Sequence, residues 1–117
     1  MAFGWNDFLI LARKMIESND QMLLEAIQRT AIGRTYYATF NLIMEEECEG
    51  GRMQRGGSAS DHWRLQDHLE RAGRHDASRR LHALRRLRNQ SDYDLVVRDI
   101  DEMVRSALQI GEELTRS

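Results

Sequence analysis

The segment RRLRNQSDYDL, residues 85–95, gathers the side chains of this chain that are best suited to chemistry. Arg85, Arg86 and Arg88 precede Tyr93, which has an aspartate on either side. Guanidinium groups make planar, bidentate contacts with phosphates and carboxylates, and a tyrosine ring offers a stacking surface together with a hydroxyl group. The segment therefore indicates either a binding site for an anionic ligand or no more than a helix end followed by a loop.

The positive charge of the chain is concentrated in its middle. The formal net charge is −2, but residues 52–88 contain ten arginines against four acidic residues, which leaves about +6 there. The flanking segments, residues 1–51 and 89–117, each carry about −4. Sixteen of the seventeen cationic residues are arginine, which favours a phosphate-binding surface, although a biased genome composition would give the same excess.

Apolar residues recur at helical spacing along most of the chain, which contains no proline. This periodicity predicts an all-α protein, an up-and-down bundle of four to five helices in a single domain, residues 1–117. The second helix is apolar over more than half of its circumference, so we expect it at the centre of the bundle. Four glycines and no periodicity predict a flexible loop over residues 48–60. The predicted helices span residues 6–17, 19–46, 61–72, 76–89 and 99–115.

Arg88 lies on the apolar side of its predicted helix. It forms one line with Ala77, Leu81 and Leu84, with successive residues spaced four, three and four apart. An arginine at the end of an apolar stripe must find an acidic partner or a cleft, because an unpaired buried charge is costly. We therefore expect its guanidinium group at the edge of the core.

The sequence shows no recognisable metal site and no cofactor motif. Its four histidines, at positions 62, 68, 75 and 82, do not have the spacing of three or four residues with which a helix presents metal ligands. The one cysteine, Cys48, lies among glutamates that disfavour a thiolate, and a single cysteine fits a reducing compartment. No apolar stretch reaches the length of a membrane span. We predict a cytoplasmic protein without a metal, a cofactor or a membrane association.

Two segments taken together resemble the HEPN domain family. AIGRTYYATFNLIM, residues 31–44, is similar to the RxYYaxF helix of small bacterial members, and LHALRRLRNQSDYDLVV, residues 81–97, is similar to their RxxxDYd turn. The resemblance covers most of the chain and implies a helical bundle that pairs into a homodimer, with the arginine motif in a cleft at the interface. It also implies metal-independent RNase activity and a role as a toxin encoded beside a small nucleotidyltransferase-type antitoxin.

The catalytic motif of the HEPN resemblance is incomplete in this sequence. In the family an arginine is followed, four to six residues later, by a histidine, whereas here Arg88 and four further residues lead to Tyr93. A tyrosine hydroxyl, with an ordinary pKa of about 10, is a poor general base at neutral pH. Arg55 does precede His62 at a similar spacing, and we interpret that as chance. Arg88 and Tyr93 are the candidate catalytic residues of a motif without its usual histidine.

A line of polar side chains runs along the second predicted helix, on the side that we expect to face Arg88. We predict that Arg34 on this line pairs with Asp92, and that Arg88 and Tyr93 border a groove. The alternative is a purely structural network of buried ion pairs that fixes the end of the fourth predicted helix. The polar line consists of Thr30, Arg34, Tyr37 and Asn41, and the candidate binding residues are Arg34, Tyr37, Asn89 and Asp92.

Two functions are compatible with these residues. The first is a HEPN-like toxin or RNA-binding module of a toxin–antitoxin or defence system, which the basic segment 52–88 supports. The second is a non-catalytic, dimeric helical bundle that acts as the protein partner of a nucleotidyltransferase-like protein. The missing histidine and the acidic flanks support this second function.

The breadth of the apolar stripes predicts a homodimer. A chain of 117 residues has limited means to cover an apolar surface as broad as that of its second helix. Light scattering at micromolar concentration is expected to give the mass of two chains. A clean monomer at that concentration would contradict the prediction.

Overall fold

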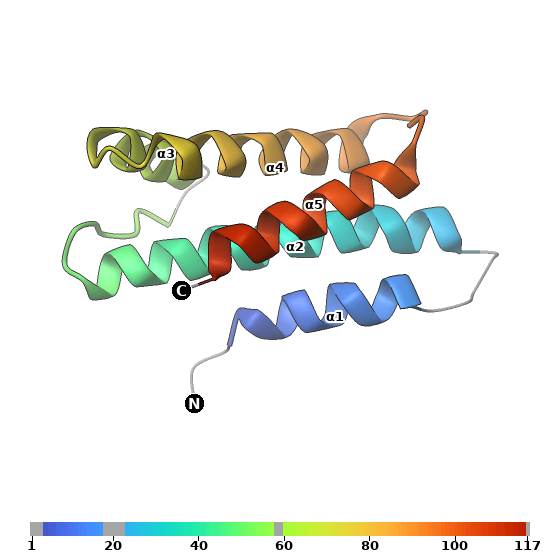
Figure 1. The fold of residues 1–117 in the computed structure, drawn as a ribbon, viewed down its shortest axis with the longest axis horizontal. Helices are drawn as coiled ribbons and strands as arrows, with labels where there is room; N and C mark the ends of the chain where they lie inside the picture. The colour runs from blue at the N-terminus through green and yellow to red at the C-terminus, as the bar shows by residue number, and fades with distance from the viewer. Residues whose placement is uncertain (1–3, 18–22, 58–59, 117) are drawn as a thin grey trace.

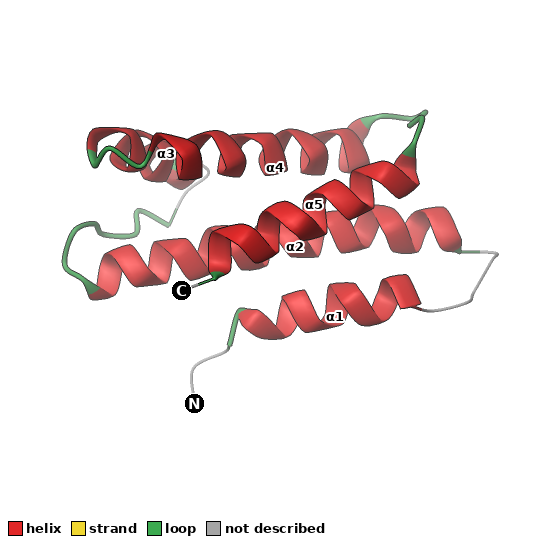
Figure 2. Ribbon diagram, viewed as in Figure 1, coloured by secondary structure: helices red, strands yellow, loops and turns green. Residues whose placement is uncertain are grey.

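Five helices make up the fold. In the computed structural model, which describes residues 4–17, 23–57 and 60–116, they are α1 (Asn6–Glu17), α2 (Leu24–Glu49), α3 (Asp61–Arg71), α4 (His75–Tyr93) and α5 (Ile100–Thr115). The described residues contain no β-strand (Figure 2), which confirms the all-α prediction. None of the helices described is both long and apolar enough to cross a lipid bilayer.

Helices α1, α2, α4 and α5 run along the long axis of the molecule, and their chain direction alternates (Figure 1). The short α3 lies beside the first part of α4. α2 packs against α1, α4 and α5. The fold is therefore an up-and-down bundle with α2 at its centre, as the breadth of its apolar surface predicted.

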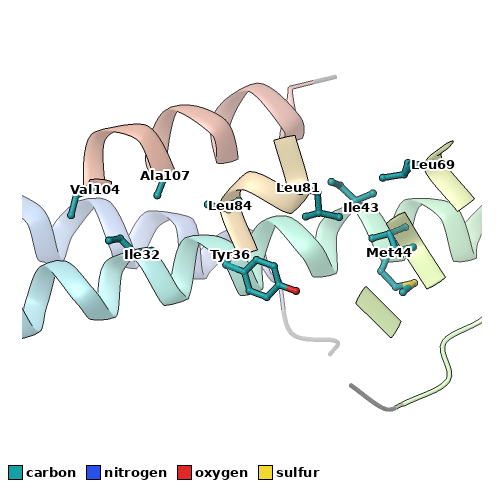
Figure 3. Close-up of a cluster of buried hydrophobic side chains, with 10 residues drawn as sticks. Ile32, Tyr36, Ile43, Met44, Leu69, Leu81, Leu84, Val104 and Ala107 are labelled. Carbon is teal, nitrogen blue, oxygen red and sulfur yellow. The ribbon is translucent and has the colours of Figure 1, made fainter. Parts of the chain in front are cut away.

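The hydrophobic core forms where α2 meets α3, α4 and α5 (Figure 3). Its side chains recur at helical spacing on each of these elements, so that α3, α4 and α5 each bury one stripe, whereas α2 is buried on several sides. The aromatic ring of Tyr36 belongs to this core, while its hydroxyl group points away from the aliphatic side chains. The buried cluster comprises Ile32, Tyr36, Ile43, Met44, Leu65, Leu69, Leu81, Leu84, Val104 and Ala107.

Helix α4 is longer than the sequence predicted. It continues four residues beyond Asn89 to Tyr93, so Asp92 and Tyr93 lie on its last turn rather than in a loop. The exposed carbonyl groups at this helix end are satisfied by Arg29 of α2, whose Nη1 donates to the carbonyl oxygens of Ser91 at 2.9 Å and Asp94 at 2.7 Å. A cation that caps the last carbonyls stabilises a helix C-terminus, and the sequence of α4 alone gives no sign of it.

The other helix boundaries agree closely with the prediction. α3 and α5 each differ from it by one residue at one end, and Gly73, with φ of +79°, ends the α3 segment in the left-handed conformation. α2 continues to Glu49, so the loop predicted over residues 48–60 begins at Gly50 instead. Residues 19–22, where the second predicted helix begins, lie outside the described residues.

Hydrogen bonds hold the loop after α2 against the bundle. We call its described part, residues 50–57, the glycine-rich loop. The carboxylate of Asp61 accepts the backbone N–H groups of Gly56 and Gly57, each at 3.0 Å, and pairs with Arg64 at 2.9 Å. Within the same loop Arg55 donates to Oδ1 of Asn41 on α2 at 2.8 Å. These contacts bring the guanidinium group of Arg55 back to the middle of α2.

A buried carboxylate fastens the end of α2 to the α3–α4 region. Glu47 is only 3% exposed, and it pairs with Arg52, with Arg74 at 2.9 Å and with His68 at 3.4 Å. Burial is the largest single influence on the pKa of Glu47 and raises it. The contacts with Arg52 and His68 together outweigh burial, so the pKa is lowered. The carboxylate therefore stays charged and compensates positive charge from the basic segment.

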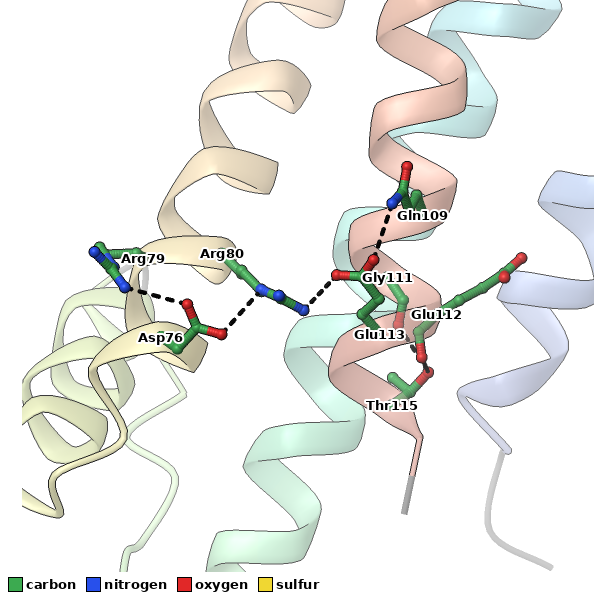
Figure 4. A network of polar contacts seen from close by, with 8 residues as sticks. All are labelled: Asp76, Arg79, Arg80, Gln109, Gly111, Glu112, Glu113 and Thr115. Carbon is green, nitrogen blue, oxygen red and sulfur yellow. Dashed lines mark hydrogen bonds and ion pairs between the residues drawn. The ribbon is translucent and has the colours of Figure 1, made fainter.

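A second polar network joins α4 to α5 (Figure 4). Asp76 accepts from Arg79 and Arg80, both at 3.2 Å, and Arg80 also pairs with Glu113 of α5. Gln109 donates to the same glutamate at 3.0 Å. Arginines of the basic segment thus serve to hold helices together, as well as adding charge to the surface.

α5 packs tightly against α2 at Gly111, and this contact generates a prediction. A Cβ atom at this position would lie 2.8 Å from Cγ2 of Thr35 and 3.0 Å from Oγ1 of Thr39. We expect Gly111→Ala to lower the free energy of unfolding by about 1–3 kcal/mol, because the crowded core must shift to accept the methyl group. Urea unfolding measures the change.

Gly33, on the outer side of α2, is the matched control for Gly111→Ala. A Cβ atom there would meet only Oδ1 of Asp92, at 3.8 Å, which is an ordinary van der Waals distance. Gly33→Ala is expected to stabilise the protein by up to about 1 kcal/mol, because alanine favours a helix over glycine. A Gly111→Ala protein as stable as the wild type would disprove the close packing of α5 on α2.

Candidate functional site

A cleft of about 810 Å³ opens between α2, α3, α4 and the glycine-rich loop, and we call it the arginine cleft. Its walls combine three guanidinium groups with aromatic rings and two asparagine side chains. This is the mixture of positive charge and stacking surfaces that binds polyanions with planar groups. The lining residues are Trp5, Tyr36, Tyr37, Phe40, Asn41, Arg55, Gly57, Asp61, His62, Arg85, Arg88, Asn89 and Tyr93.

Arg88 is the most firmly held of the three arginines. Its Nε lies 2.9 Å from Oδ2 of Asp92, its Nη2 donates to the hydroxyl group of Tyr37 at 3.0 Å, and its Nη1 donates to Oδ1 of Asn89 at 3.3 Å. The guanidinium carbon lies 5.3 Å from the ring centre of Tyr37 and 5.9 Å from that of Tyr93. With 19% of its side chain exposed, Arg88 is at the edge of the core, as predicted, and its charge is matched by Asp92.

The ion pair predicted between Arg34 and Asp92 is not formed. Because α4 extends through Asp92, this carboxylate lies one turn after Arg88 and pairs with it instead. Arg34 lies over the ring of Phe8, with 4.9 Å between the guanidinium carbon and the ring centre. Arg34 and Asp92 nevertheless line the same small hollow of about 230 Å³. The hollow is lined by Thr30, Gly33, Arg34, Tyr37, Arg88 and Asp92.

The six residues singled out from the sequence are thus divided between two neighbouring hollows. Asn89 and Tyr93 line the arginine cleft, Arg34 and Asp92 line the small hollow, and Tyr37 and Arg88 line both. The polar line on α2 does face the end of α4, as expected. The structure therefore brings the predicted residues together but changes which of them pair.

Sequence reasoning missed several residues of the arginine cleft, above all Arg55, His62 and Arg85. Arg85 precedes Arg88 by three residues, a spacing that places both on one side of a helix and could have revealed it. Arg55 and His62 were noticed for their spacing and set aside as chance, yet both line this cleft. Their position depends on how the loop folds back on α2, for which the sequence carries no periodic signal.

Most arginines of the basic segment have carboxylate partners inside the protein. Of the ten arginines in residues 52–88, seven form ion pairs, and the three without one among the described residues are Arg55, Arg85 and Arg86. The guanidinium carbon of Arg85 lies 4.7 Å from the ring centre of Trp63, and among the described residues Arg55 donates hydrogen bonds to the neutral Asn41. Two of the three uncompensated cations therefore line the arginine cleft, which favours an anionic ligand there.

His62 and Tyr36 form a buried neutral pair in the wall of the cleft. The Tyr36 hydroxyl lies 2.7 Å from Nδ1 of His62, whose side chain is almost fully buried. Burial and the nearby charge of Arg85 lower the pKa of His62 to about 4, and burial raises the pKa of Tyr36 to about 12. At neutral pH the phenol keeps its proton and can donate it to Nδ1. A buried imidazole with so low a pKa is poorly suited to act as a general base.

Comparisons with known proteins add no family to this geometry. No protein-family model matches the chain, and searches among curated proteins and among solved structures gave no match either. The HEPN resemblance accordingly stays a prediction from the two sequence segments. The function has to be argued from the site itself.

The low pKa of His62 predicts a loss of stability in mild acid. Because the pKa falls from 6.5 to about 4 on folding, the stabilisation from the neutral imidazole is complete above pH 6.5 and is lost as the pH falls towards 4. We expect the free energy of unfolding to fall by about 2 kcal/mol between pH 7 and pH 4.5. Urea unfolding across this range measures the decrease, and His62→Gln should remove most of it.

Carboxyl groups account for the loss of stability at lower pH, below the range in which His62 titrates. The pKa values of Glu47, Asp61 and Glu70 are all lowered on folding, so their contributions are lost only below their ordinary values of 3.8 to 4.5. An unaltered pH dependence in His62→Gln would show that the neutral His62 is not its source.

Proposed function

We propose that this protein binds single-stranded RNA in the arginine cleft, as a HEPN-like RNA-binding module. The observation that carries the proposal is the position of Arg55 and Arg85. They lack carboxylate partners among the described residues, and they line the same cleft as exposed aromatic rings. Phosphate groups are the natural partners of such guanidinium groups, and they supply most of the affinity for a nucleic acid.

The aromatic rings favour unpaired bases. Tyr37 is 40% exposed and Tyr93 is 72% exposed, so both rings offer a face or an edge to a ligand. Bases stack on such rings only when they are not already stacked within a duplex. The side-chain N–H groups of Asn89, next to Arg88, form no hydrogen bond with a described residue and can donate to a base edge. These features support single-stranded rather than double-stranded RNA.

The site supports binding better than cleavage. Arg88, the candidate catalytic arginine, already has Asp92 as its counter-charge. His62, which the fold places in the same cleft, is buried and bonded to Tyr36. General acid–base catalysis needs a group that is accessible to the reacting atoms and titrates near neutral pH, so we propose binding without hydrolysis.

The HEPN resemblance gives the wider setting of the proposal. It suggests a cytoplasmic homodimer in a toxin–antitoxin or defence system, with a nucleotidyltransferase-type antitoxin as a protein partner. The two sequence segments around Tyr36 and Arg88 support this setting, and the arginine cleft contains residues from both.

Neighbouring arginines on α4 allow a matched test of RNA binding. Arg85→Ala and Arg55→Ala are expected to weaken binding of an unstructured RNA of about ten nucleotides by about three- to tenfold each. Each should also reduce the slope of log affinity against log salt by about 0.7, the value for one phosphate contact on a single strand. Tyr93→Ala should lower the RNA affinity at least about fivefold, because a stacking ring is lost. Fluorescence anisotropy measures all of these.

Arg86→Ala is the control, because Arg86 is exposed, has no ion pair among the described residues and does not line the cleft. It should keep nearly the affinity and the salt slope of the wild type. Equal losses of RNA affinity in Arg85→Ala and Arg86→Ala would show that the interaction is general charge attraction. That result would contradict the assignment of the arginine cleft as the binding site. A duplex bound as tightly as the single strand would contradict the stacking argument, and shortened RNA after incubation would contradict binding without hydrolysis.

A further inference from the structure

The loop that follows α4 presents aliphatic side chains to solvent. Leu95 is 95% exposed and Val96 is 77% exposed, the two highest values among the large apolar residues described. Side chains in this position contribute almost nothing to the hydrophobic stabilisation of the fold. Adjacent exposed apolar residues commonly mark a surface that binds another molecule.

Hydrogen bonds from Arg29 of α2 hold this loop in place. In addition to the carbonyl groups of Ser91 and Asp94, Arg29 bonds the carbonyl oxygen of Leu95, with Nη2 at 3.4 Å. The side chain of Arg29 is only 20% exposed, and its bond to Ser91 is partly buried, whereas its bonds to Asp94 and Leu95 lie at the surface. The exposure of Leu95 and Val96 is therefore a fixed feature of the surface, and binding there would require little ordering of the loop.

A hollow of about 420 Å³ lies beside the exposed residues, between the end of α4 and the start of α5. Its floor is apolar and includes Leu87, Val97 and Met103. Its rim is predominantly acidic, with one cation, Arg98, and three carboxylates that form no ion pair with a described residue. These belong to Asp94, Asp99 and Glu102, and we call the hollow with its rim and Val96 the acidic hollow.

Helix electrostatics account for only part of this arrangement. Asp99 and Glu102 are at the start of α5, where negative charge stabilises a helix. That effect explains neither Asp94, at the C-terminal end of α4, nor the apolar floor beside two exposed aliphatic side chains. A binding function accounts for all of these features together.

We propose that the acidic hollow, together with Leu95, is a docking surface for a protein segment that is both apolar and basic. An aliphatic side chain of the partner enters the hollow, and an arginine or lysine next to it pairs with the carboxylates of Asp94, Asp99 or Glu102. Charge complementarity selects this occupant, because the three carboxylates outnumber the one cation, Arg98, and RNA would meet net negative charge here. A second copy of the chain, joined through the same surface, would bring two sets of carboxylates together.

The proposal is independent of RNA binding, because the two surfaces share no lining residue. Tyr93 lines the arginine cleft, and the next residue, Asp94, lines the acidic hollow. Successive residues at the end of α4 thus point into two surfaces with opposite charge. The loss of one binding activity can therefore be measured while the other is retained.

Titration of the isotopically labelled full-length protein with a designed peptide tests the docking surface. The probe is a blocked helical peptide of about twelve residues with leucines on one face and arginines beside them. We expect saturable shifts of the backbone amide signals of residues 87, 94–99 and 102–106, which surround the acidic hollow. Peptides with glutamate in place of arginine, or serine in place of leucine, should bind at least about tenfold more weakly.

Two double variants separate the docking surface from general apolar contact. Leu95→Ser with Val96→Ser should weaken the arginine–leucine peptide at least about tenfold, and it should leave the melting temperature unchanged because both side chains are exposed. Ile10→Ser with Leu11→Ser, at exposed apolar positions of α1, is the matched control and should bind as the wild type does.

Several results would overturn the proposal. No saturable binding at millimolar peptide, or equal binding of the glutamate peptide, would remove the basic partner. Shifts centred on the arginine cleft, or wild-type affinity in the Leu95→Ser, Val96→Ser protein, would move the site elsewhere. If the serine variant instead converted a dimer into a monomer in light scattering, the surface would join two copies of this chain.

Discussion

Burial of α2 is the constraint on which the rest of the structure depends. This helix is apolar around most of its circumference, and α1, α4 and α5 all pack against it. Gly111 allows α5 to approach as far as Thr35, because any side chain at that position would collide with α2. These three helices cover most of α2, and the loop before α3 folds against α2 beside α4. The arginine cleft opens there, so its position follows from the way in which the core is completed.

Internal ion pairing then decides which charges are left for binding. The basic segment reads as a uniform run of arginines, but carboxylates from its own helices and from α2 and α5 neutralise most of them. Glu47 alone, buried at the end of α2, is in contact with two arginines and a histidine. A buried carboxylate with several cationic partners stays charged and resists rearrangement. Within the basic segment, three arginines form no ion pair with a described residue, and two of them, Arg55 and Arg85, share one cleft.

The last turn of α4 connects the two proposed binding surfaces. Arg29 satisfies the carbonyl groups at this helix end, so the turn and the following loop keep one conformation. Within that conformation Tyr93 lines the basic cleft and Asp94 lines the acidic hollow. A single guanidinium group on α2 thereby positions two neighbouring surfaces of opposite charge.

The sequence by itself determined the helices, the central position of α2 and the placement of Arg88 at the edge of the core. These features follow from the spacing of apolar residues within each segment, which is a local property. Only the tertiary structure decided that Asp92 pairs with Arg88 instead of Arg34, since α4 continues because of Arg29, a residue far away in the chain. It also decided which arginines stay unpaired and brought His62 into the cleft. Such pairings depend on distances between side chains of separate helices, and packing of the whole bundle sets those distances.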